Sequence, residues 1–130
     1  TEGNPDCHLI LRGGSHPNYD MFSVDDATKM LQKAGLPTKL MIDASHANSR
    51  KIPARQRDVI NDIAAQVERG NESIFGVMIE SNLVEGRQDF VDMQSLCYGQ
   101  SITDPCIGWD DTERALETLA NAASKRQVLA

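Results

Sequence analysis

Short apolar runs alternate along the chain with longer segments in which apolar residues recur at helical spacing. The apolar runs lie at residues 7–12, 38–43 and 74–80. Continuous apolar runs of this length are typical of strands that are buried on both faces of a parallel sheet. The pattern therefore predicts three strands, which end near Arg12, Asp43 and Glu80.

The segments between these runs predict helices. Ser23, followed by Val24 and two aspartates, resembles a helix N-terminus, and Gly35 with Pro37 predicts where that helix ends. A second helix is expected from near Pro53 to Gly70. Its predicted buried stripe consists of Val59, Ile60, Ile63, Ala64 and Val67. The third strand leads into a long irregular stretch, 81–108, and a last helix is expected to start at Asp110 or Asp111.

Strands that alternate with helices in this way predict an α/β fold with a parallel sheet and right-handed crossovers. Arg12, His46 and Glu80 are evenly spaced, 34 residues apart. This interval is close to the roughly 31 residues per unit of a (β/α)₈ barrel of about 250 residues. Three units cannot close a barrel, so they are either the last three βα units of a (β/α)₈ TIM barrel or the core of a small open, doubly wound sheet.

Composition and charge narrow the possible partners. The 130 residues are 40% hydrophobic and 25% charged, with a net charge of -6 and no cluster of Lys and Arg. This balance argues against nucleic acid or an anionic membrane as partner. The apolar runs are shorter than the roughly 20 residues of a membrane helix, so a cytoplasmic protein is expected. Three cysteines, Cys7, Cys97 and Cys106, predict free thiols in a reducing compartment. Thr1 in place of an initiator Met, with a strand so near the start, suggests a fragment of a longer polypeptide.

The candidate functional residues lie where the predicted strands end. Arg12, Asp43, His46 and Glu80 are at or just past these ends, and parallel folds place their ligand sites at that edge. For any one of them, the simpler interpretation is a charged residue where the chain meets water. Four together favour a common pocket.

His46 and Glu80 suggest a metal site. One neutral imidazole with carboxylate oxygens suits Mn²⁺, Fe²⁺, Co²⁺ or Zn²⁺ better than Ca²⁺, and a carboxylate that ends an apolar strand would be stabilised by a cation. Asp104 is a third candidate, with an Asx turn before Pro105 as the alternative. Cys106 is either a thiolate ligand or, as we prefer, a small buried hydrophobic residue.

Arg12 is followed by Gly13 and Gly14. A guanidinium beside two flexible backbone N–H groups suits a phosphate or a carboxylate. His8, inside the first strand, is interpreted as a core residue rather than a catalytic one.

Several blocks of the chain, taken together and in order, closely resemble a known family. They are Gly3–Gly14, Pro17–Tyr19, Met41–Ser49, Gly76–Ser81 with Leu83–Gly86, and Tyr98–Asp104 with Cys106–Trp109. The resemblance is to the microbial 3-deoxy-D-arabino-heptulosonate 7-phosphate (DAHP) synthases that aromatic amino acids regulate. The stretch from Arg87 to Leu96 matches least well.

The resemblance implies a metal-dependent (β/α)₈ barrel that condenses phosphoenolpyruvate with erythrose 4-phosphate, the first step of the shikimate pathway. By position, His46, Glu80 and Asp104 are similar to three of the family's four metal ligands, and Arg12 to a residue that binds phosphoenolpyruvate. The fourth ligand is an upstream Cys that neither Cys7 nor Cys106 matches. Asp43 is a candidate for orienting His46 by accepting a hydrogen bond, with a structural role as the alternative. No residue is assigned as a general acid or base.

On this interpretation residues 1–130 are the C-terminal part of one barrel domain, inactive alone, and the full-length enzyme is a homo-oligomer. Two other interpretations remain. One is a stand-alone open-sheet module that binds a phosphorylated ligand without catalysis. The other is a regulatory or assembly fragment that docks onto other subunits through exposed barrel faces, and it predicts self-association because unpaired sheet edges favour pairing.

Overall fold

The computed structural model describes residues 2–4 and 6–129; Thr1, Pro5 of the first resembling block, and Ala130 lie outside the described residues. Its first part alternates strands and helices in the predicted order. The elements are β1 (Leu9–Leu11), α1 (Met21–Lys33), β2 (Leu40–Asp43), the 3₁₀ helix η1 (Pro53–Arg55), α2 (Gln56–Glu68) and β3 (Ile74–Met78). They are followed by β4 (Val84–Arg87), β5 (Gln100–Ser101) and α3 (Trp109–Leu129).

β1, β2 and β3 form one sheet in that order, and both pairings are parallel. Leu11 pairs with Ile42, which pairs with Val77. Because side chains alternate between the faces of a sheet, these three residues point to the same face, and all three belong to the apolar core or pack against it. The parallel α/β architecture expected from the sequence is therefore confirmed.

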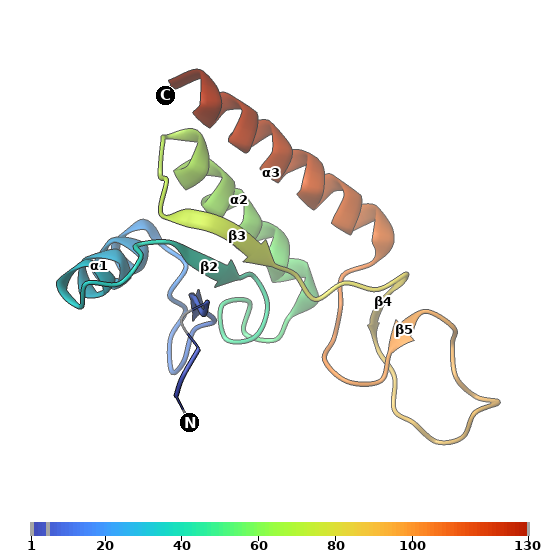
Figure 1. Cartoon of the computed structure of the whole chain (residues 1–130). Helices are drawn as coiled ribbons and strands as arrows, with labels where there is room; N and C mark the ends of the chain where they lie inside the picture. Colours follow the sequence, from blue (N-terminus) through green and yellow to red (C-terminus); the bar gives the residue numbers. More distant parts are fainter. Residues whose placement is uncertain (1, 5, 130) are drawn as a thin grey trace.

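The helices cover one face of this sheet. The predicted stripe of α2 is buried throughout (Val59, Ile60, Ile63, Ala64 and Val67). α3 packs against α2 (Figure 1), and its Arg126 donates to the Ile74 carbonyl of β3. The opposite face is open. Ile10, which points to it, is 40% exposed, so the expectation that β1 is buried on both faces is wrong for this chain. His8 is also exposed rather than in the core, and its ring forms a T-shaped pair with that of Phe75.

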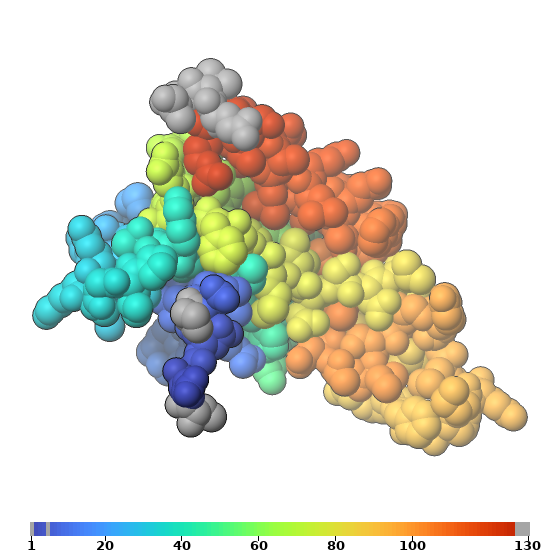
Figure 2. All heavy atoms as spheres, in the orientation of Figure 1, coloured from blue at the N-terminus to red at the C-terminus, as the bar shows by residue number. Residues whose placement is uncertain are grey.

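Residues 81–108 contain two short strands that the sequence pattern did not predict. β4 and β5 pair with each other in parallel, apart from the main sheet. The segment projects from the rest of the molecule as a separate lobe at the lower right of Figure 2. Several of its apolar side chains are exposed, among them Phe90, Val91, Met93 and Tyr98, whereas Cys106 and Ile107 near its end are buried. No helix of the described residues is both long and apolar enough to span a membrane.

Helix α1 begins two residues before the expected Ser23. The carboxylate of Asp20 accepts hydrogen bonds from the backbone N–H groups of Phe22 and Ser23 and from the Ser23 hydroxyl. Ser23 is therefore the partner of the capping residue and not the cap itself. At the other end the helix stops at Lys33, followed by Gly35 with a φ of 69°, as the sequence predicted.

Asp20→Ala should lower the free energy of unfolding by about 1 kcal/mol at neutral pH, the usual effect of losing an N-cap. The pKa of Asp20 is lowered below its ordinary value of 3.8, mainly because the Ser23 hydroxyl donates a hydrogen bond to the carboxylate. Partial burial acts in the opposite direction but is the smaller effect. The stabilisation is therefore present at pH values above 3.8 and is lost as the pH falls through the lowered value. Urea unfolding at neutral and acidic pH measures this difference. Asp26→Ala, in the same helix, is the control; equal effects of the two substitutions would contradict the cap.

Candidate metal centre

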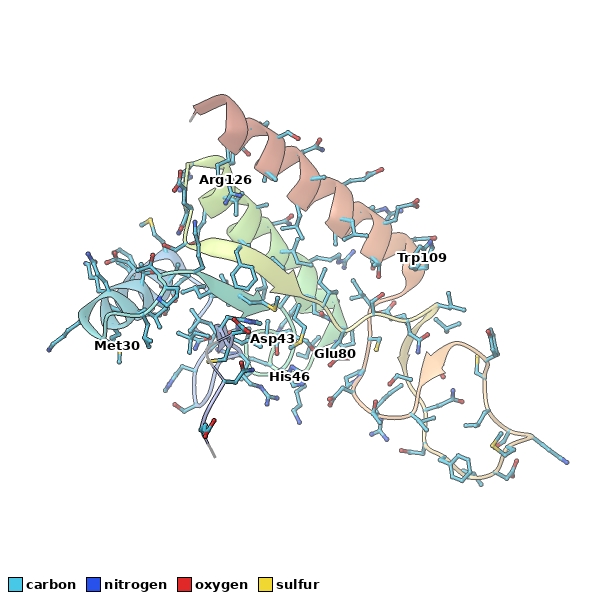
Figure 3. The ribbon with its side chains drawn as sticks, viewed as in Figure 1. Met30, Asp43, His46, Glu80, Trp109 and Arg126 are labelled. Carbon is cyan, nitrogen blue, oxygen red and sulfur yellow. The ribbon has the colours of Figure 1, made fainter. Side chains whose placement is uncertain are left out.

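Three side chains from separate segments converge beyond the carboxyl ends of β2 and β3. One ligand-type atom from each of His46, Glu80 and Asp104 lies within 4.8 Å of the others. Nε2 of His46 is 3.8 Å from a Glu80 carboxylate oxygen and 3.5 Å from one of Asp104. In Figure 3, Asp43, His46 and Glu80 are labelled close together near the ends of β2 and β3. The structure thus brings together the three residues that the sequence singled out.

His46 is oriented by Asp43, the last residue of β2. Asp43 is fully buried, and its carboxylate accepts hydrogen bonds from the Ser45 backbone N–H, at 2.7 Å, and from Nδ1 of His46, at 2.6 Å. A carboxylate can only accept, so Nδ1 carries the proton. In the neutral imidazole, Nε2 is then the unprotonated nitrogen, and it faces Glu80 and Asp104. This arrangement is the one found around many metal-bound histidines.

The loop after β2 holds His46 in an uncommon backbone conformation. The φ of His46 is 42°, and Arg50 and Lys51 have φ values of 54° and 57°. The loop closes on itself, because the Lys51 N–H donates to the His46 carbonyl and the Ser49 N–H donates to that of Ser45. Left-handed conformations are unfavourable for residues other than glycine and recur at functional sites. The loop therefore fixes the imidazole at a conformational cost.

Glu80 and Asp104 are linked through Ile107. The Ile107 N–H donates to the Glu80 carbonyl at 2.9 Å, and Ser81 forms a parallel bridge with Ile107. This pairing continues the sheet beyond β3 and brings Asp104, three residues earlier, to the same edge. The Glu80 side chain is 31% exposed, so it is less buried than the sequence suggested.

When His46 is neutral, the three converging groups are all hydrogen-bond acceptors. Two carboxylates about 5 Å apart repel each other by on the order of 1 to 3 kcal/mol, depending on how far solvent screens them. Asp104, whose side chain is 45% exposed, is the better screened of the two. A divalent cation would turn this repulsion into attraction, and one imidazole with two carboxylates is a donor set that Mn²⁺, Fe²⁺, Co²⁺ and Zn²⁺ accept.

Cys106 lies beside this group without belonging to it. The residue is buried, and its thiol contacts a Glu80 carboxylate oxygen at 3.9 Å. Burial is the main cause that raises the pKa of the thiol, and the nearby carboxylates act in the same direction. A protonated, buried thiol agrees with the interpretation of Cys106 as a small apolar residue. All three cysteines are free thiols, as expected.

Arg12 follows β1 on the same edge and is exposed to solvent. It comes one residue after Leu11, which pairs with Ile42 next to Asp43. The backbone N–H groups of Gly13 and Gly14 were expected to bind an anion, but both bond within the protein. The Gly13 N–H donates to the Asn18 side chain and the Gly14 N–H to the His16 carbonyl. Neither N–H group is therefore free for an anion, and Arg12 itself remains the anion-binding candidate.

Gly13 is required by a close approach between two loops. Its φ is 75°, and a Cβ at this position would lie 2.7 Å from the Cβ of Ala47. The loop after β1 thus touches the residue next to His46, which brings Arg12 toward the metal-ligand candidates.

The model of the DAHP synthetase I family matches residues 1–117. The chain belongs to the DAHP synthetase I family. It is 52% identical over 127 residues to the Phe-sensitive phospho-2-dehydro-3-deoxyheptonate aldolase of Escherichia coli K12. The matched region covers 98% of this chain and 36% of that relative. It is 48% identical over 126 residues to the Trp-sensitive enzyme of the same strain, and this matched region covers 97% of this chain and 36% of that relative.

A solved structure of a relative has the same fold as this chain. The phospho-2-dehydro-3-deoxyheptonate aldolase of Francisella tularensis SCHU S4 superimposes with a TM-score of 0.90 at 50% identity, over 97% of this chain and 37% of that chain. The chain therefore spans about a third of the length of the relatives that it matches.

Two buried side-chain amides near the carboxyl ends of the strands were not singled out from the sequence. Asn48 donates to the carbonyls of Leu11 and Asp43, and its side-chain oxygen accepts from the Asn18 N–H. It thus joins the segments that carry Arg12 and His46. Gln56, the first residue of α2, is fully buried and contacts Glu80. The sequence held one indication of the role of Gln56, namely a polar residue next to the apolar stripe of α2.

Proposed function

We propose that the complete polypeptide containing this chain is a DAHP synthase, which condenses phosphoenolpyruvate with erythrose 4-phosphate and releases phosphate. Residues 1–130 are then the C-terminal part of a single catalytic domain, the last three βα units of a (β/α)₈ barrel. Membership of the family and the superposition at a TM-score of 0.90 support this assignment. The open face of the sheet agrees with it, because in a closed barrel that face points to the packed interior.

The observation that carries the proposal is the convergence of His46, Glu80 and Asp104 within 4.8 Å. These residues are proposed as ligands of a divalent metal, which is Mn²⁺, Fe²⁺, Co²⁺ or Zn²⁺ by the donor set. A bound cation of this kind supplies Lewis acidity toward a carbonyl oxygen. Asp43 keeps the His46 imidazole in the tautomer that presents Nε2 to the site.

Arg12 is proposed to bind phosphoenolpyruvate. Its guanidinium, at the carboxyl end of β1, would pair with the substrate's carboxylate or phosphate and hold it in place. In the overall reaction the methylene carbon of phosphoenolpyruvate forms a bond to the aldehyde carbon of erythrose 4-phosphate. Water adds at the enol carbon, and inorganic phosphate leaves.

Phosphate release by the full-length polypeptide tests the proposal. With both substrates present, release is expected to stop when a chelator removes the metal and to return when Mn²⁺, Fe²⁺, Co²⁺ or Zn²⁺ is added. Omitting erythrose 4-phosphate is the control, since condensation requires both substrates. The 130-residue chain alone is expected to show no turnover. If no divalent metal supports release by the full-length polypeptide, the non-catalytic phosphate-binding module becomes the better interpretation.

A further inference from the structure

Gln56 contacts both backbone groups of Glu80. Its Nε2 donates to the Glu80 carbonyl at 2.9 Å, and its Oε1 accepts from the Glu80 N–H at 3.0 Å. The side chain is fully buried. A primary amide offers one donor and one acceptor side by side, as a peptide group does. Gln56 therefore pairs with Glu80 much as a neighbouring strand would.

This pairing stands where the sheet itself has ended. The last backbone bond between the β2 and β3 segments runs from the Ala44 N–H to the Met78 carbonyl at 2.8 Å. Beyond Ala44 the chain turns away into the His46 loop, so no backbone from that side reaches Glu80. The Gln56 amide takes the missing place, and Ile107 bonds to the same Glu80 carbonyl at 2.9 Å. Glu80 is thus held by the amide of Gln56 and by the backbone of Ile107.

We propose that Gln56 is a positioning residue, which fixes the Glu80 backbone so that its carboxylate faces His46 and Asp104. The inference rests on the proposed metal site and assigns to α2 a part in building it. Glu80 lies past the end of β3, where without Gln56 only the pairing with Ile107 would restrain its backbone and hence the direction of its carboxylate. Residues that orient metal ligands typically change metal affinity 10- to 100-fold when they are replaced.

Gln66 offers a matched control on the same helix. It is also buried, and its Nε2 donates to the Tyr19 carbonyl and to Asp62, with no contact to the three ligand candidates. Both glutamines thus fasten a helix to a loop through hydrogen bonds. Only Gln56 does so at a proposed ligand.

The test compares Gln56→Met with Gln66→Met in the full-length enzyme. Methionine has a similar length but forms neither hydrogen bond. Gln56→Met is expected to raise the dissociation constant for Co²⁺, measured by competition with a chelator, roughly tenfold. This is the low end of the range, because Ile107 still holds Glu80. The visible absorption bands of bound Co²⁺ should change as well. Gln66→Met should leave both the dissociation constant and the spectrum as in wild type.

The outcomes separate the inference from the function on which it rests. If His46→Ala leaves Co²⁺ affinity unchanged, the proposed metal site itself fails. If His46→Ala weakens binding but Gln56→Met and Gln66→Met both match wild type, the positioning role of Gln56 is overturned. If Gln56→Met does not fold, Gln56→Asn takes its place. Asparagine keeps the amide, but its side chain is one methylene shorter, so the amide no longer reaches the Glu80 backbone. Wild-type affinity in Gln56→Asn would also overturn the role.

Discussion

His46→Ala is expected to raise the dissociation constant for a divalent metal at least about 100-fold in the full-length polypeptide. Metal binding by four ligands is worth on the order of 10 to 16 kcal/mol, so one ligand accounts for roughly 3 kcal/mol. Since about 1.4 kcal/mol corresponds to a factor of ten, this loss is about 100-fold. Alanine also removes the imidazole that separates the Asp43 carboxylate from those of Glu80 and Asp104. Competition with a fluorescent chelator measures the constant.

His16→Ala is the control for this substitution. His16 is exposed in the loop after β1, and its ring bonds only to the neighbouring Ser15 hydroxyl among the described residues. The same change of side chain there should leave metal affinity unchanged. Equal affinities in wild type and His46→Ala would remove His46 from the metal site, and with it the main support for the proposed function.

The position of the site was predictable because it follows from rules about parallel strands. Apolar runs mark the strands, and the residues that follow them must share one edge of the sheet. Arg12, Asp43, His46 and Glu80 could therefore be assigned to this edge before the structure was known. Asp43 was a candidate for orienting His46, with a structural role as the alternative, and the structure contains the expected hydrogen bond between the two side chains.

Other features depend on contacts between distant segments, which a local pattern does not contain. The two amides are examples: Asn48 reaches back to Leu11, and Gln56 reaches forward to Glu80. The pairing of β4 with β5 is non-local in the same sense, and both strands are too short for a periodic signal. The role of the glycines was misjudged because the bond from the Gly13 N–H to the Asn18 side chain joins residues five positions apart in an irregular loop, which has no periodic pattern.

Helix α1 illustrates a local ambiguity. Asp20 and Ser23 are both good N-caps, and a sequence cannot show which of them has the extended backbone that a cap requires. In the structure Asp20 is extended, with φ of -66° and ψ of 162°, and Ser23 lies in the first turn. Boundaries of this kind shift by a few residues without moving the strand ends, so they do not affect the site.

Asp43→Asn is expected to weaken metal binding at least about 100-fold, the upper end of the range for residues that orient a ligand. The amide has the shape of the carboxylate, and its oxygen can still accept from the Ser45 N–H. Its NH₂ group, however, would meet the Nδ1–H of His46, and two donors cannot bond. The imidazole is then expected to move its proton to Nε2, because Nδ1 can accept from the amide. A protonated Nε2 cannot bind a metal.

The tautomer itself distinguishes this cause from a general loss of stability. ¹⁵N NMR of the histidine ring should find the proton on Nδ1 in the metal-free wild type and on Nε2 in Asp43→Asn. Asp62→Asn is the matched control, since Asp62 accepts from the Gln66 side chain and does not contact His46. It should change neither the tautomer nor the metal affinity. Retention of the Nδ1 proton in Asp43→Asn, together with wild-type affinity, would reduce Asp43 to the structural role that was its alternative interpretation.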